Sequence, residues 1–221
     1  MPSAVTLTAR ALLLDMDGTL VDSTALVEEI WTMLARRFGH DPEELIRRIH
    51  GVRAADSIAR FAPAGSDVPA LLTELDQLEL DGSPATVEIP GARDLMAALP
   101  AGSHALVTSA GVALARARLA GAGVRVPDTL VTAEDVEAGK PHPDGYLLAA
   151  ERLGVDPADA IVYEDAEAGI RAGLAAGMRV VVVGDHASDA TVGLPRVRDH
   201  RGTTVEVHDG ILTLTLPGAA G

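Results

Sequence analysis

The chain has no cysteine, and only 2% of its 221 residues are aromatic. Without cysteine it can form no disulfide, no thiolate nucleophile and no cysteine-based metal site. With so few aromatic residues, its core must consist of aliphatic side chains, and hydrophobic residues make up 48% of the sequence. No apolar run approaches the roughly 18 residues that predict a membrane span. These features are typical of a globular protein with an aliphatic core.

Positive charge is also scarce, because 18 Lys and Arg face 32 Asp and Glu, for a net charge of −14. This balance argues against nucleic acid or an anionic membrane as a partner, and an anionic substrate would need local cations. No secretory leader pattern, P-loop or glycine-rich dinucleotide motif is present, and the seven histidines lack zinc-site spacing. We expect a cytoplasmic protein that is a monomer or a weak homodimer.

The most informative segment is Asp15-Met16-Asp17-Gly18, which directly follows the apolar run Ala11–Leu14. The run predicts a buried strand, and two carboxylates at its exit need a cation, a ligand or solvent. Asp15 is placed to attack phosphorus, and Asp17 to protonate the leaving oxygen and later activate water. Gly18 lets the chain turn there. The alternative is an aspartate-rich turn with no catalytic role.

From Ala92 onward, helix and strand patterns alternate, which predicts right-handed βαβ units and a mostly parallel sheet. Residues 23–87 contain only helical patterns, beginning with Thr24–Phe38 and a helix at Pro42 whose N-cap is Asp41. The fold class is therefore α/β, a Rossmann-like parallel sheet with a small helical cap inserted after the first strand. We expect the core to comprise residues 1–22 and 88–221. Residues 203–216 predict a hairpin with an Asp209-Gly210 turn, as an edge ribbon.

Polar residues follow three further elements. Thr108 and Ser109 end a strand before a helix, where hydroxyl and N–H groups bind phosphate, although simple capping is common there. Lys140, in a proline-rich loop, could set a positive charge against phosphate, or could be an ordinary solvated lysine. Glu164 and Asp165 end another strand and could bind Mg²⁺, or could be an exposed Glu beside an N-cap Asp.

The carboxyl ends of parallel strands share one edge of a sheet, so these groups are expected to meet. Together they provide a nucleophile, an acid/base, a phosphate cradle, a lysine and a metal site. Phosphoryl transfer needs this set of groups.

In these motifs the chain resembles the haloacid dehalogenase-like hydrolases over most of its length, to about Val183. The resemblance implies Mg²⁺-dependent transfer through an aspartyl-phosphate on Asp15, with Asp17 as general acid/base. It implies that Thr108 and Lys140 hold the phosphoryl group. It further implies that Asp15, the Asp17 carbonyl and Asp165 bind Mg²⁺, with Glu164 nearby or acting through water. The family often has Ser after the Glu-Asp pair, where this chain has Ala166.

Within the family, the chain resembles sugar-phosphate and polyol-phosphate phosphatases of the 2-deoxyglucose-6-phosphatase and glycerol-phosphatase type. The resemblance rests on segments 50–53 and 59–63 of the cap, 87–92 at the hinge and 164–169. It implies a small phosphorylated metabolite as substrate. Arg53 either reaches that substrate from the cap or pairs with a nearby carboxylate.

Two alternatives to a phosphatase stay open. A β-phosphoglucomutase would share the core motifs, but it typically has an arginine where this chain has Ala54 and a histidine where it has Val27. A non-catalytic sugar-phosphate binding protein would not need the complete set of catalytic groups. A haloacid dehalogenase is less consistent, because it lacks an aspartate corresponding to Asp17.

Overall fold

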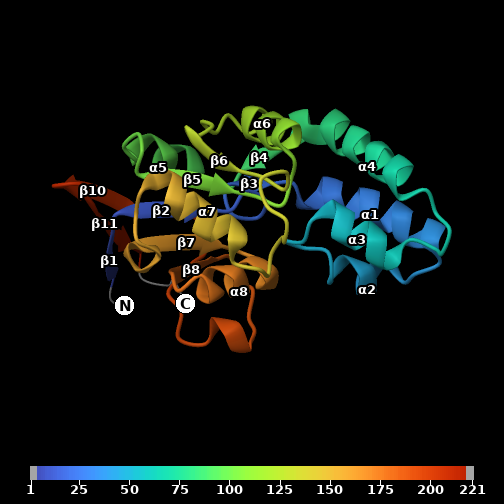
Figure 1. Cartoon of the computed structure of the whole chain (residues 1–221). Coiled ribbons are helices and arrows are strands. Elements are labelled where there is room, and N and C mark those ends of the chain that lie inside the picture. The colour runs from blue at the N-terminus through green and yellow to red at the C-terminus, as the bar shows by residue number, and fades with distance from the viewer. Residues whose placement is uncertain (1–3, 218–221) are drawn as a thin grey trace.

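A computed structural model describes residues 4–217 of the chain (Figure 1). Its centre is a six-stranded sheet in which all strands run parallel, in the order β6-β5-β2-β7-β8-β9. The strands are β2 (Ala11–Leu14), β5 (His104–Val107), β6 (Thr129–Val131), β7 (Ala160–Glu164), β8 (Arg179–Val183) and β9 (Arg196–Val197). The predicted α/β class and parallel sheet are thus confirmed.

The first strand of this sheet, β2, lies in its middle. The chain builds outward from β2 to β5 and β6, then crosses to the other side of β2 with β7, β8 and β9. The reversal of strand order falls between β2 and β7, where the open ends of an α/β sheet form a ligand crevice. Asp15 follows β2, and Glu164 ends β7, so the two carboxylates flank this crevice.

Helices cover both faces of the sheet (Figure 1). Side chains alternate along each strand, so Leu12 and Leu14 pack in one apolar cluster and Leu13 in the other. The first cluster includes α5 (Ala92–Ala98) and α6 (Val112–Gly121), and the second α7 (Asp144–Leu153) and α8 (Glu167–Ala175). The interior is therefore aliphatic on both faces, as the composition predicts.

Between β2 and α5 the chain forms four further helices beside the carboxyl end of the sheet (Figure 1). They are α1 (Thr24–Phe38), α2 (Pro42–Ile46), α3 (Ala54–Phe61) and α4 (Val68–Gly82), and we call them the helical insert. They enclose an apolar cluster of their own, with Trp31, Leu34 and Leu75 buried at its centre. The predicted N-cap is confirmed, since the Asp41 carboxylate accepts the Glu44 N–H at 2.9 Å.

Short elements flank the insert and connect the units. Strands β3 (Val21–Asp22) and β4 (Val87–Glu88) pair antiparallel where the chain enters and leaves the insert. One-turn 3₁₀ helices lie at η1 (Ser83–Ala85), η2 (Pro157–Asp159) and η3 (Asp189–Thr191). The β3–β4 pair thus forms the two-stranded neck of the insert.

The tail forms the predicted hairpin, β10 (Thr204–His208) and β11 (Ile211–Leu216), with positive φ at Asp209 and Gly210. It is not an edge of the main sheet. Instead β11 pairs antiparallel with β1 (Val5–Ala9), making a separate three-stranded sheet whose Leu212, Leu214 and Leu216 join the core. The sequence did not predict β1, so this pairing could not be foreseen. Among residues 4–217, no helix is both long and apolar enough to cross a bilayer.

Candidate active site

The loop after β2 brings two aspartates into one tight turn. The Met16 carbonyl accepts the N–H groups of Thr19, Leu20 and Val21, which folds the loop back on itself. Gly18 has φ +80°, and a Cβ there would lie 2.0 Å from the Asp165 carboxylate. Only glycine therefore allows the loop to approach the end of β7 so closely.

A buried lysine joins the carboxylates of two strands. The Lys140 ammonium contacts Asp15 Oδ1 and lies 2.6 Å from Glu164 Oε1 and 3.2 Å from the Val107 carbonyl. Burial opposes its charge, but Asp15 and Glu164 together hold the pKa of Lys140 above its usual value. The three N–H groups have three acceptors, so the ammonium is fixed against the predicted nucleophile.

Glu164 is fully buried, and its two oxygens already accept four donors. Oε1 accepts Lys140 Nζ and the Tyr146 hydroxyl at 3.0 Å, and Oε2 accepts the N–H groups of Asp165 and Ala166 at 3.0 and 3.1 Å. These contacts orient Lys140 and the end of β7. Direct binding of a metal by Glu164 would require some of these donors to be given up.

The donor set fits a divalent cation. Oxygens of Asp15, Glu164 and Asp165 lie within 4.8 Å of one another. Burial, and then the neighbouring Glu164, raise the pKa of both Asp15 and Asp165 above the usual carboxyl range. When all three carboxylates are ionised, they exceed the single charge of Lys140 by two negative charges. A hard cation with oxygen ligands, such as Mg²⁺, would balance that excess.

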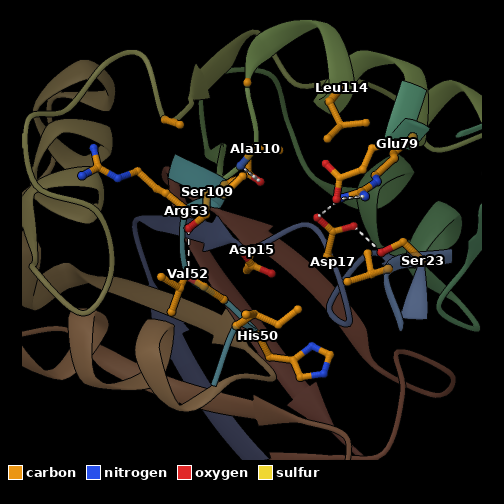
Figure 2. A pocket seen from close by; sticks show the side chains of 18 of the residues that line it. Asp15, Asp17, Ser23, His50, Val52, Arg53, Glu79, Ser109, Ala110 and Leu114 are labelled. Atoms are coloured by element: carbon orange, nitrogen blue, oxygen red, sulfur yellow. Dashed lines mark hydrogen bonds and ion pairs between the residues drawn. The ribbon is translucent and has the colours of Figure 1, made fainter. Parts of the chain in front are cut away.

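Asp17 does not point into the lysine cluster. Its Oδ1 accepts the Ser23 hydroxyl at 2.6 Å and its Oδ2 accepts Arg118 Nη1 at 2.8 Å. Figure 2 shows Asp17 held between Ser23 and the ion pair to which Glu79 belongs. Ser23, Glu79 and Arg118 were not predicted from the sequence as residues of the site. The signal for Arg118 was a charged residue on the apolar face of a helix, with Leu114, Ala115 and Leu119.

The two predicted phosphate-binding hydroxyls differ in their contacts. The Thr108 hydroxyl accepts the Ala110 N–H at 3.1 Å and lines the cavity described below. The Ser109 hydroxyl donates to the Gly51 carbonyl at 2.9 Å and so contacts the insert (Figure 2). Thr108 therefore faces the cavity, whereas Ser109 joins the core to the insert.

Arg53 makes contacts on both sides of the boundary between insert and core. Its Nε and Nη2 donate to both oxygens of Asp56, at 2.8 and 3.1 Å. Its Nη1 donates to the carbonyls of Val136 and Glu137 at 3.3 and 3.0 Å. Of the two readings left open for Arg53, pairing with a nearby carboxylate is the one present in the structure.

A cavity of 320 Å³ lies between the sheet edge and the helical insert. The core lines it with Asp15, Asp17, Thr108, Asp165 and Glu134. The helical insert lines it with Trp31 and Leu72 and with the carboxylates of Asp76 and Glu79. The predicted reactive groups and further acidic side chains thus face one cavity, in which Glu79 lies close to Asp17 (Figure 2).

Residues 9–177 match the family of haloacid dehalogenase-like hydrolases. The chain belongs to this family. It is 41% identical to hexitol phosphatase A of Escherichia coli over 86% of this chain and 88% of that protein. It is 34% identical to glycerol-1-phosphate phosphohydrolase 2 of Saccharomyces cerevisiae over 80% of this chain and 75% of that protein. The predicted membership of the family and its phosphatase branch is confirmed.

Solved structures share the fold of this hydrolase. CbbY from Rhodobacter sphaeroides, solved with phosphate, superposes with a TM-score of 0.72 at 24% identity, covering 85% of this chain and 92% of CbbY. A β-phosphoglucomutase from Clostridium difficile gives a TM-score of 0.75 at 21% identity, covering 86% and 91%. At such identities the likeness establishes the architecture alone. The phosphatase relatives identify this hydrolase as a phosphoric monoester hydrolase.

Proposed function

We propose that this enzyme hydrolyses small sugar or polyol monophosphates through an aspartyl-phosphate on Asp15. The observation that carries the proposal is the buried Lys140, which is bonded to Glu164 and to Asp15, and Asp15 itself lines the cavity. A fixed, desolvated ammonium at that place stabilises the negative charge that develops on a transferring phosphoryl group. The phosphatase relatives make a phosphate ester the natural substrate.

In the first half-reaction an Asp15 oxygen attacks phosphorus, and the bond between phosphorus and the ester oxygen breaks. Asp17 donates its proton to the departing oxygen, which leaves as an alcohol. Lys140 and the Thr108 hydroxyl hold the phosphoryl oxygens. In the second half-reaction water attacks the aspartyl-phosphate while Asp17 takes its proton, which releases inorganic phosphate and restores both aspartates.

We further propose that Asp15, the Asp17 carbonyl and Asp165 bind Mg²⁺, with Glu164 acting through Lys140 and the backbone of β7. Bound there, Mg²⁺ would neutralise charge on the phosphoryl oxygens. The support is the excess of negative charge in a buried cluster of oxygen ligands. In this proposal residues 23–87 act as a cap that closes the cavity over the substrate and excludes bulk water.

The residues that line the cavity favour a monophosphate over a bisphosphate as the substrate. Val27 and Ala54, the two departures from the mutase pattern, both line it. Its two arginines, Arg53 and Arg118, are each paired with carboxylates. The carboxylates of Asp76, Glu79 and Glu134 on its lining would repel a second phosphate, but they accept hydrogen bonds from hydroxyl groups. These features support a hydrolase for a hydroxylated, otherwise uncharged molecule.

The test is release of inorganic phosphate from a panel of hexose, pentose and polyol monophosphates, with Mg²⁺ and with EDTA. We expect turnover only with Mg²⁺. Asp15→Asn should lower kcat by at least about 1,000-fold, because it removes the nucleophile. The matched control is Asp185→Asn, an exposed aspartate just beyond the neighbouring strand β8, which should keep wild-type activity.

Two outcomes would contradict the proposal. Full activity after metal removal would exclude the Mg²⁺ role, and Asp15→Asn within tenfold of wild type would exclude Asp15 as nucleophile. Incubation with β-glucose 1-phosphate and a bisphosphate primer tests the mutase alternative. Glucose 6-phosphate formed with little free phosphate would establish a mutase instead.

A further inference from the structure

Arg118 is a charged residue in a place that normally holds an apolar one. It lies in the second half of α6, on the same face as Leu114 and Leu119, and only 3% of its surface is exposed. A guanidinium buried there without partners would be strongly destabilising. Its partners are therefore the reason that the position can be an arginine.

Those partners come from two other parts of the chain. Arg118 Nη1 donates to Asp17 Oδ2 at 2.8 Å, and Arg118 Nη2 lies 3.3 Å from Glu79 Oε1. Asp17 belongs to the loop after β2, and Glu79 belongs to α4 of the helical insert. Glu79 is itself only 7% exposed. The three side chains form a line from the insert, through a core helix, to the predicted general acid/base, and the first two of them are buried.

The line fixes the direction of the Asp17 carboxylate. One oxygen is held by Ser23 and the other by Arg118, so the side chain is restrained from two sides. Proton transfer to a leaving oxygen depends on this direction, because a misplacement of about 1 Å can lower a rate about 100-fold. Both restraints act on the atoms that would carry the proton.

We propose that Arg118 is a positioning residue for the proton transfers of Asp17, and that Glu79 holds Arg118 in place from the insert. This inference rests on the proposed function, since it needs Asp17 to be the general acid. It makes one residue of α4 a part of the catalytic arrangement, although Glu79 does not contact the reacting atoms.

The alternative is that Glu79, Arg118 and Asp17 only join the insert to the core. Esters with different leaving groups distinguish a positioning role from a purely structural one. p-Nitrophenolate is stable as an anion and departs without a proton, whereas the alkoxide of glycerol 1-phosphate needs one. The value of kcat/KM reports steps up to departure of the leaving group. Misplacing Asp17 should therefore lower kcat/KM for glycerol 1-phosphate only, whereas general damage lowers it for both esters.

Arg118→Met keeps an aliphatic side chain of similar shape to the stem of arginine and removes the guanidinium. We expect kcat/KM for glycerol 1-phosphate to fall about 100-fold and that for p-nitrophenyl phosphate to fall less than about tenfold. Arg116→Met is the matched control, because Arg116 is exposed on the same helix. It should leave both values unchanged. Arg118→Lys keeps the charge and should recover part of the loss on glycerol 1-phosphate.

Glu79→Gln tests whether the insert helps to position Asp17 through Arg118. It also replaces Arg118→Met as the test if circular dichroism shows that Arg118→Met does not fold. It leaves Arg118 and Asp17 intact, and we expect a loss of about tenfold, again confined to glycerol 1-phosphate. Equal losses on both esters, or no loss on either, in a folded variant would overturn the inference. A wild-type enzyme that hydrolyses neither these two esters nor any monophosphate of the panel with Mg²⁺ present would instead overturn the proposed function, and the inference with it.

Discussion

Lys140 is the only lysine in the chain, where the other 17 of the 18 basic residues are arginine. Its ammonium fits three acceptors in a space closed by Tyr146 and the end of β5. A guanidinium is planar, larger and has five donors, so it matches neither the space nor the acceptors. The residue type at this position is therefore set by the shape of the site as well as by its charge.

We predict that Lys140→Arg loses almost as much activity as Lys140→Met, with kcat lowered about 100- to 1,000-fold in both. Lys140→Met also leaves two buried carboxylates without their cation, which should cost about 3–5 kcal/mol of unfolding free energy. Kinetics and urea denaturation measure the two effects. Arg179→Lys, at an exposed position, is the control. An active Lys140→Arg enzyme would show that charge alone is sufficient.

The sequence could predict the residues that act through their position on a strand. Asp15, Thr108 and Glu164 follow or end apolar runs, and parallel strands bring such ends together. It could not predict Arg118 or Glu79 as partners, because their pairing depends on how α4 packs against α6. That packing joins residues distant in sequence, and no local pattern encodes it. The presence of a single lysine among 18 basic residues is a further signal for the site, and it comes from composition rather than from a motif.

At the scale of elements, the loop before α3 joins the insert to the sheet edge. Its Gly51 carbonyl accepts the Ser109 hydroxyl, and Arg53 bonds to the carbonyls of residues 136 and 137. A Cβ at Gly139 would lie 2.6 Å from Arg53 Nε, so Arg53 packs directly on the loop that carries Lys140. The insert is thus in direct contact with the loop that places the lysine.

We predict that Arg53→Ala raises KM by about tenfold, with a smaller effect on kcat, because it weakens the closed arrangement rather than the chemistry. The same factor is expected for hexose, pentose and polyol phosphates. Arg48→Ala, which removes an exposed ion pair with Glu44 in the same insert, is the control. A change in substrate preference would show instead that Arg53 contacts the substrate.

Helix positions agree closely between sequence and structure where caps and periodicity are strong. The sequence pattern predicts helices over Thr24–Phe38 and Asp144–Leu153 and a helix start at Pro42, and the structure has these bounds. The pattern also predicts a helix over Asp56–Phe61, but α3 begins two residues earlier, because Arg53 takes the N-cap position without a capping side chain. Strands of two residues, such as β3 and β4, have too little length for a period-two pattern and were not foreseen.

At the scale of the whole molecule, two buried histidines tie stability to pH. Burial lowers the pKa of both His104 and His200, and His200 Nε2 contacts the Thr19 carbonyl at 2.7 Å. His104 Nε2 and His200 Nδ1 have no hydrogen-bond partner among the described residues. The folded state therefore favours the neutral ring, whereas the unfolded chain takes up a proton near pH 6.5.

The sign follows from this difference. The contribution of each neutral, buried histidine to the unfolding free energy is fully present above about pH 6.5. It is lost as the pH falls below that value, because only the unfolded state binds the proton. We predict that His200→Gln flattens the dependence of unfolding free energy on pH between 7.5 and 5, measured with urea. His208→Gln, whose side chain is 93% exposed, should leave the dependence unchanged. The active-site carboxyl groups titrate in the wild type and in both variants. The difference in unfolding free energy between wild type and variant therefore reports the histidine alone.

The central place of β2 has a consequence for how the protein is made. Its partners begin at His104 and Ala160, so the strand that carries Asp15 emerges from the ribosome long before either neighbour. At about 5–20 residues per second, the roughly 90 residues up to β5 take about 5–20 s to synthesise. During that time a fully apolar strand has no sheet to join. The nascent chain is then most exposed to aggregation.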